Sequence, residues 1–284
     1  MNVINKIKAH YNNANIVEKF IYINVGVFLF VFLLNTLGYL FQANNQLVNW
    51  FILPATFDGF ISKPWTIITY GFVHVNFLHI LMNLIALYYI GNLFLNYFTP
   101  KQFITFYILG TVLGGIIFLL SYNFFPAFEK DVSNSVLLGA SAGVSAIFIG
   151  LATYIPNFEL KFPLIGHIKL WYIAAFWIAL DIIQIPAGNA GGHLAHIGGA
   201  LFGFIYVNQA STVEIQIWSK IAHFFTSKKP PLKTVYKSKK STQKKEANTT
   251  YKQQKINLIL DKISKSGYDT LSKDEKDFLF KQGK

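Results

Sequence analysis

Six apolar stretches between residues 20 and 209 constrain the fold of this chain more than any other feature. A helix that crosses a bilayer needs roughly 20 mostly apolar residues, and residues 20–41 provide them without a single charge. The other stretches are 77–98, 103–125, 139–155, 170–185 and 192–207, of which the last three are short or diluted by small and polar residues. We therefore expect an all-α membrane protein, a bundle of six transmembrane helices.

The composition agrees with a membrane protein and excludes several kinds of chemistry. Only 13% of the residues are charged, against about 25% in a typical soluble domain. The first apolar stretch begins too late and runs too long for a cleavable signal peptide, so we expect a retained span. Cysteine is absent, which excludes disulfides and thiolate chemistry. We expect no cofactor and no nucleic-acid partner.

The lysines indicate how the chain is oriented. The sequence has no arginine, and 17 of its 25 lysines lie in residues 220–284, beside six acidic residues. With six spans, the N-terminal segment and the loops on its side hold Lys6, Lys8, Lys19, Lys101, Lys161 and Lys169, whereas the opposite loops hold Lys63 and Lys130. The positive-inside rule then puts both termini in the cytoplasm. We expect a multi-pass protein of the bacterial inner (plasma) membrane.

Changes in composition divide the chain into four parts. Residues 1–19 are a polar lead-in, 20–209 the membrane domain, and 210–253 a basic linker whose lysines attract anionic lipid headgroups. In residues 254–284, Gly267 is a natural helix stop and Ser272 with Glu275 form a capping box that opens a second helix. We expect a cytoplasmic tail that ends in a small helical hairpin, which associates with itself or docks a partner.

Polar groups inside a membrane are costly, so each one is a candidate functional residue. Ser141 stands in Gly-Ala-Ser-Ala-Gly at the start of the fourth stretch, between Gly139 and Gly143. A serine at a helix N-terminus lies beside unpaired backbone N–H groups, which suits a nucleophile whose reaction develops an oxyanion. The alternative is that these small residues only allow close helix packing.

A histidine on the sixth stretch is the candidate base. His196 lies three residues before Gly199 and seven before Gly203, so it projects from the face that carries this G-x-x-x-G pattern. Gly139 and Gly143 form a similar face on the serine helix, and two such faces bring helix backbones into near contact. A base within reach of a serine is the minimal requirement for activating it. The alternative is a histidine bonded to a backbone carbonyl or lining a water cavity.

A third group of polar residues lies just before and within the second stretch. His74, His79 and Asn83 follow the pattern His-(x)4-His-(x)3-Asn, and residues 79 and 83 share one helix face. Both side chains donate hydrogen bonds, so with the Ser141 backbone N–H they suit an oxyanion hole. The alternative is hydrogen bonding that fastens the bundle.

These three motifs, in this order on six apolar stretches, resemble the rhomboid family of intramembrane serine proteases over roughly residues 20–209. The resemblance implies a Ser-His dyad without a third member, with Ser141 as nucleophile and His196 as base. It implies that His79, Asn83 and the Ser141 backbone hold the oxyanion, and that His74 supports this region. It also implies that the substrates are single-pass transmembrane proteins.

Three positions depart from the family pattern. Ala142 follows the nucleophile where the family usually has glycine, and its methyl group is expected to narrow the oxyanion region. Ser145 stands where the family often has an aromatic ring against the base, and Thr66 follows Trp65 where an arginine is often found. The alternative function is a weakly active or inactive rhomboid-like protein that binds membrane proteins.

Asp181 and His193 fall outside these motifs. We expect Asp181 to have a structural role, paired with Gln184 or with a polar group on a neighbouring helix. His193 lies one turn before His196, and we expect it to face the same cavity. Four intramembrane histidines raise the alternative of a metal site, but the sequence lacks His-Glu-x-x-His, so we expect none.

Overall fold

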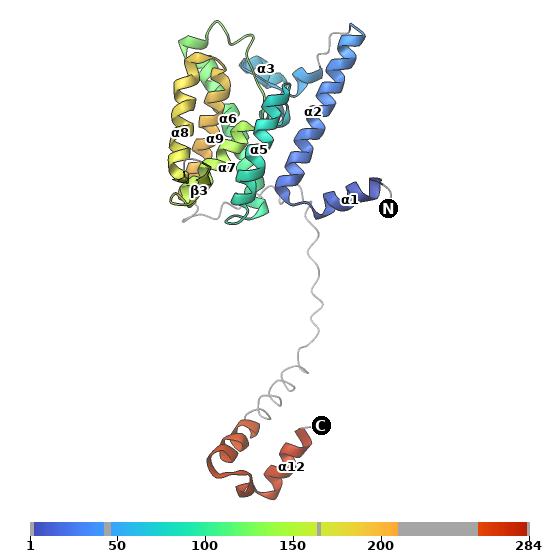
Figure 1. Cartoon of the computed structure of the whole chain (residues 1–284), viewed down its shortest axis with the longest axis vertical. Helices are drawn as coiled ribbons and strands as arrows, with labels where there is room; N and C mark the ends of the chain where they lie inside the picture. Colours follow the sequence, from blue (N-terminus) through green and yellow to red (C-terminus); the bar gives the residue numbers. More distant parts are fainter. Residues whose placement is uncertain (1–2, 43–46, 164–165, 210–254, 283–284) are drawn as a thin grey trace, which may run out of the picture. The chain divides into compact units, whose positions relative to one another are not determined.

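The computed structural model describes residues 3–42, 47–163, 166–209 and 255–282. The chain divides into two units, Met1–Ile215 and Gln216–Lys284, which are treated separately. Six apolar helices run alongside one another in the first unit (Figure 1): α2 (Ile16–Leu40), α5 (Phe77–Phe94), α6 (Pro100–Phe124), α7 (Ser141–Tyr154), α8 (Leu170–Gln184) and α9 (Ala190–Gln209).

Shorter elements precede and connect these helices. The helical ones are α1 (Val3–Asn13), η1 (Leu47–Trp50), α3 (Phe57–Ser62), α4 (Thr66–Thr69), η2 (Tyr70–Phe72), η3 (Pro126–Phe128) and η4 (Ile185–Ala187). The strands are β1 (Leu53–Pro54), β2 (Val136–Leu137), β3 (Glu159–Phe162) and β4 (Gly166–Lys169).

Membrane-crossing length is reached by five helices among the described residues: Ile16–Leu40, Phe77–Phe94, Pro100–Phe124, Leu170–Ala187 and Ala190–Gln209. The 14 residues of α7 extend only about 21 Å at 1.5 Å per residue. The hydrocarbon core of a bilayer is about 30 Å thick. The mainly helical membrane architecture is therefore as expected, whereas the sixth span stays a prediction.

Local capping groups decide where two of the long helices begin. Asn15 and Glu18 form a reciprocal capping box, so α2 begins at Ile16, four residues earlier than expected. Thr99 and Gln102 form another around Pro100, which starts α6 three residues early. In each box the side chains bond to backbone N–H groups that have no partner within the helix.

Helix α7 is the core of the bundle. All of its residues from 142 to 152 are buried, and Figure 1 shows it among α5, α6, α8 and α9. Small side chains allow the close contacts: a Cβ on Gly110 of α6 would lie 2.3 Å from the Ala146 Cβ. A helix that is apolar on every face is buried on every face, and this is why a 14-residue helix holds its place without the length of its neighbours.

The long loop after α2 packs on the bundle. Its strand β1 pairs antiparallel with β2, with Leu53 opposite Leu137. Leu53 and Ala55 are fully buried, and the Asn123 side-chain amide donates to the Ala55 carbonyl at 2.7 Å. This part of the loop is therefore packed against the protein.

The connection between α7 and α8 contains an element that the sequence analysis did not predict. Strands β3 and β4 form an antiparallel hairpin in which Glu159 pairs with Lys169. The pair of Leu160 with Ile168 lies within it, and Leu160 packs against the main hydrophobic core. The hairpin leads directly into α8 at Leu170.

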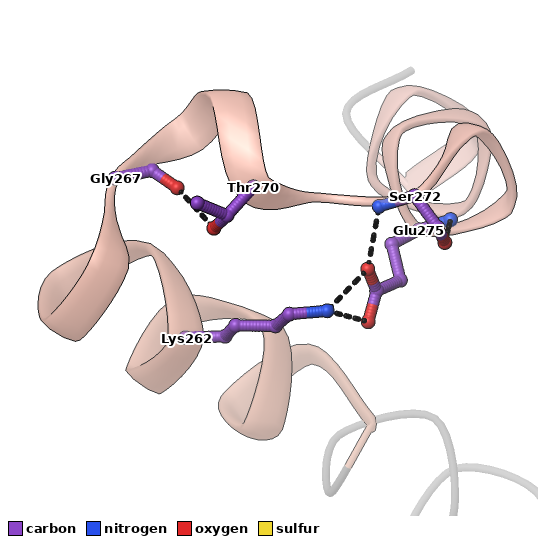
Figure 2. Close-up of polar contacts among 5 residues, drawn as sticks. All are labelled: Lys262, Gly267, Thr270, Ser272 and Glu275. Carbon is purple, nitrogen blue, oxygen red and sulfur yellow. Dashed lines mark hydrogen bonds and ion pairs between the residues drawn. The ribbon is translucent and has the colours of Figure 1, made fainter.

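In the second unit, the described residues 255–282 form a helix over residues 255–266 and α12 (Lys273–Gln282), separated by Gly267 and by η5 (Tyr268–Thr270). Figure 2 shows the polar contacts of this turn. The Ser272 backbone N–H donates to Glu275 at 2.8 Å, and the Glu275 N–H donates to Ser272 Oγ at 3.3 Å. Lys262 pairs with the same carboxylate at 3.0 Å. The linker, residues 210–253, lies outside the described residues.

Candidate active site

Ser141 is the first residue of α7, at the end of a loop that is held rigidly. The Gly139 N–H donates to the Tyr70 carbonyl at 2.9 Å, and the Ala140 N–H donates to His74 Nε2 at 3.3 Å. The serine hydroxyl therefore lies beside the first, unpaired N–H groups of a helix, where backbone dipoles favour negative charge.

The conformation of Gly139 requires glycine. Its φ of +119° is one that residues with a side chain rarely adopt. A Cβ at this position would lie 2.8 Å from His79 Cε1 and 3.8 Å from Ser141 Oγ. The His79 ring and the Ser141 hydroxyl therefore lie close to the same point, which the absent side chain leaves open.

His74 supports the serine loop from behind. Its side chain is fully buried, and its ring lies 5.0 Å from that of His79. The neutral ring accepts from Ala140 through Nε2, so its proton is on Nδ1. His74 thus contacts the loop that precedes Ser141, and its role in a reaction stays a prediction.

Helix α9 carries His196 against α7 at very short range. A Cβ on Gly199 would lie 2.0 Å from the Ala142 carbonyl oxygen, and one on Gly203 would lie 2.2 Å from that of Ala146. The predicted glycine face of α9 thus brings the two backbones together. The face of α7 that receives α9 is not the expected one of Gly139 and Gly143. A Cβ on Gly143 would meet Tyr107 and Thr111 of α6, whereas α9 packs on Ala142 and Ala146.

One cavity brings together the candidate nucleophile, the candidate base and the two candidate oxyanion donors of α5. It has a volume of about 560 Å³ and is lined by Ser141, His196, His79 and Asn83, together with Met82, Ile85, Ala86, Val136, Leu137, Leu138, Val144, Trp177, Asn189 and Gly192. Sequence analysis did not single out Trp177 and Asn189. The positive φ of 51° at Asn189 follows from the tolerance of asparagine for this conformation, but only the fold brings it to the cavity.

The Ser141 and His196 side chains both line this cavity. Among the residues that the structure describes, no hydrogen bond joins these two side chains. Asn83 uses one of its two amide donors on the His79 carbonyl at 3.0 Å. The second donor is left for another acceptor. The arrangement therefore provides a hydroxyl, an imidazole and polar donors around one space.

Asp181 of α8 forms hydrogen bonds with two histidines of α9. Its Oδ1 atom accepts hydrogen bonds from His193 Nδ1 and His196 Nδ1, each at 2.8 Å. Of the two predicted partners, Gln184 or a polar group on a neighbouring helix, the second is found. The three ligand atoms lie within 4.8 Å of one another and form a group that suits a metal ion. That no metal binds here stays a prediction.

The departures from the motif pattern have different consequences from those expected. The Ala142 methyl group points toward α6, where a Cβ on Gly114 would lie 2.7 Å from it. Ala142 does not line the cavity, so the prediction that it narrows this space is wrong. Ser145 is buried without a partner for its hydroxyl, and it lines a neighbouring apolar cavity of about 250 Å³.

Thr66 and Trp65 serve the loop itself. Thr66 Oγ1 donates to the Lys63 carbonyl at 2.6 Å, and Trp65 Nε1 donates to the Trp50 carbonyl at 2.7 Å. The rings of Trp65 and Trp50 stack with centroids 5.9 Å apart. These contacts hold the loop without an arginine at residue 66.

Comparison with known proteins identifies similar chains. A family model for the Rhomboid domain matches residues 62–211. RHOMBOID-like protein 12, mitochondrial, of Arabidopsis thaliana is 28% identical over 199 residues, 66% of this chain and 56% of that protein. Presenilin-associated rhomboid-like protein A, mitochondrial, of Danio rerio is 28% identical over 153 residues, 53% of this chain and 38% of that protein. The chain thus spans about half the length of the curated relatives it matches.

Proposed function

Since this chain belongs to the rhomboid family, we propose that it is an intramembrane serine endopeptidase that cleaves single-pass transmembrane proteins. One observation carries the proposal: Ser141, at the N-terminus of α7, and His196, from α9, line the same cavity. A hydroxyl and an imidazole that line one cavity are the two groups that nucleophilic catalysis needs.

The proposed reaction uses these groups in turn. Ser141 Oγ attacks the scissile carbonyl carbon while its proton passes to His196 Nε2. The C–N bond then breaks as that proton moves to the leaving amine. Water hydrolyses the acyl-enzyme by the same proton transfers in reverse. Ser141 and His196 would be closer with substrate bound, since catalytic hydrogen bonds are often long before substrate binds.

The oxyanion is assigned to donors at the start of α7 and on α5. The Ser141 backbone N–H lies at the positive end of its helix. His79 lies beside Gly139. Asn83 lines the same cavity, and only one of its two amide N–H donors is used by the His79 carbonyl. Donors aimed at the developing charge lower the barrier most when they are fixed beforehand.

The membrane arrangement is part of the proposal. We place all six apolar helices across the bilayer, with α7 starting part-way into it, because its 14 residues are too few for the full thickness. The lysine distribution supports cytoplasmic termini, and a bacterial inner membrane stays a prediction. The two relatives described above carry names that place them in mitochondria. Anionic lipid near the basic tail and a tail-bound partner are further predictions.

The test is cleavage of a single-pass membrane reporter by the purified protein. Wild type is expected to cut, whereas Ser141→Ala and His196→Ala are expected to lose at least about 10³-fold in rate. Two matched controls separate chemistry from folding. Ser145→Ala removes a buried hydroxyl of the same helix that lies outside the cavity, and His167→Ala removes an exposed histidine of β4.

The outcomes separate the two candidate functions. Cleavage by wild type and both controls, but not by the two site variants, supports the protease. Cleavage that survives Ser141→Ala would refute the assigned nucleophile. A folded wild type that cleaves none of several reporters would favour the binding protein instead.

A further inference from the structure

Asp181 is a buried acidic residue, and burying its carboxylate among apolar helices costs free energy. It lies in the last turn of α8 with 4% of its surface exposed. A carboxylate in such surroundings is strongly unfavourable unless hydrogen bonds compensate. Both bonds that it accepts come from α9, and both end on Oδ1, while Oδ2 has no partner. A carboxylate that only fastened two helices would gain more by using both oxygens.

The hydrogen bond to His196 determines which ring nitrogen is available. A carboxylate oxygen only accepts, so His196 Nδ1 must carry a proton. The neutral ring then has an unprotonated Nε2, which is the form that can take a proton from a hydroxyl. Because His196 lines the cavity that holds Ser141, this tautomer is the one that the proposed reaction requires.

A second group on α8 restrains the same ring. Trp177 precedes Asp181 by four residues, so both lie on one face of the helix. Its ring lies 6.2 Å from that of His196 at an interplanar angle of 35°. Ser145 has no ring to offer, and Trp177 therefore supplies from α8 the aromatic contact that α7 lacks.

We propose that α8 is the positioning element of the active site, with Asp181 holding His196 in its base-competent tautomer and Trp177 limiting the rotation of its ring. This inference rests on the proposed protease function. During the reaction the serine proton moves to His196 Nε2 and then to the leaving amine. The Asp181 carboxylate offsets the charge of the transient imidazolium.

His193 provides an internal control for this assignment. It donates to the same Asp181 oxygen at the same distance as His196, but it does not line the cavity. If the carboxylate only joined α8 to α9, the two histidines would be equivalent. If it positions the base, removing His193 leaves the bond that matters intact.

The kinetic experiment compares Asp181→Asn, a replacement of the same shape without the charge, with His193→Gln in the full-length protein. We expect Asp181→Asn to lower kcat by about 10²- to 10⁴-fold with KM nearly unchanged and with thermal unfolding close to that of wild type. The loss of kcat in His193→Gln should be at least about tenfold smaller than that in Asp181→Asn. Trp177→Ala should lower kcat, and Trp177→Phe should restore most of it.

The spectroscopic experiment reads the tautomer without any turnover. In protein with ¹⁵N-labelled histidine, the His196 signals are assigned by their loss in His196→Gln. Wild type should show a protonated Nδ1 and an unprotonated Nε2, and Asp181→Asn should abolish this pattern. The result is independent of whether the reporter is cleaved.

Different results overturn the two proposals. An active wild type whose kcat is unchanged in Asp181→Asn refutes the positioning role and leaves the protease standing. So does a fall in kcat that only matches a loss of folded protein, or an equal fall in His193→Gln. A wild type without activity refutes the proposed protease function. The labelled spectra would then still report the His196 tautomer, but that tautomer would have no role in catalysis.

Discussion

At the scale of single residues, the site depends on groups that hold other groups in place. His74 fixes the Ala140 N–H, and Gly139 leaves the space that the His79 ring occupies. Neither His74 nor Gly139 takes part in bond making in the proposed reaction. Both still determine where Ser141 lies, because the serine begins a helix whose preceding loop they restrain.

Replacing Gly139 with alanine tests this loop. The new Cβ would lie 2.8 Å from His79 Cε1, and φ of +119° is unfavourable for alanine. We expect a destabilisation of about 1–3 kcal/mol and a fall in cleavage rate, measured by thermal unfolding and reporter cleavage. The control is Gly26→Ala in α2, where no atom lies within 4 Å of the added methyl group. Equal behaviour of the two variants would contradict the role assigned to Gly139.

At the scale of secondary-structure elements, α7 is placed by its neighbours and not by its own length. Its small residues let Gly199 and Gly203 of α9 approach its backbone oxygens, while Gly143 receives Tyr107 of α6. Glycine and alanine contacts of this kind are the usual basis of close helix packing in membranes. The same contacts bring His196 into the cavity beside Ser141.

The start of α12 in the tail gives a prediction about pH. Hydrogen bonds from the Ser272 N–H and from Lys262 lower the pKa of Glu275. A carboxyl group whose pKa is lowered by folding adds stability above its ordinary pKa of about 4.3. That stability is lost as the pH falls through the lowered value. We therefore expect α12 to lose helicity in acid below pH 4, measured by backbone NMR shifts of the full chain.

Substitutions distinguish this cap from general acid unfolding. Glu275→Gln should weaken α12 at neutral pH and flatten its response to acid. Asp277→Asn, a change at an exposed acid of the same helix, should leave the response as in wild type. A response that is identical in wild type and Glu275→Gln would exclude the capping carboxylate as its cause.

At the scale of the whole molecule, the chain consists of two units. The family match covers residues 62–211, and every residue assigned to the proposed site lies between 74 and 203. The second unit holds its turn together with its own contacts, Lys262 with Glu275 and Ser272 with Glu275. Nothing in the proposed chemistry draws on it.

Deleting residues 228–284 tests this separation. Because all groups of the proposed reaction remain, we expect the shortened protein in detergent to cleave the reporter at a rate within a few-fold of wild type. Membranes with and without anionic lipid give a second comparison, since the lysines removed are those expected to contact headgroups. Complete loss of cleavage in detergent would show that the tail is needed for the reaction itself.

The sequence alone determined the class of the fold and the identity of the proposed reacting groups. Long apolar stretches predict membrane helices because no other chain segment satisfies its backbone in lipid. The positions of Ser141, His196, His79 and Asn83 could be predicted because polar residues are rare in such stretches and because the glycines near them follow a helical spacing. Helix starts were less predictable, as the capping box at Asn15 lies outside the apolar pattern.

Tertiary structure decided which of these groups meet. The partners of Asp181 are on another helix, 12 and 15 residues away in sequence, and no local pattern specifies a contact between helices. The direction of the Ala142 methyl group, the face of α7 that receives α9 and the approach of Trp177 to His196 have the same origin. Each depends on how one helix is rotated against another, which packing of the whole bundle sets and a single helix cannot.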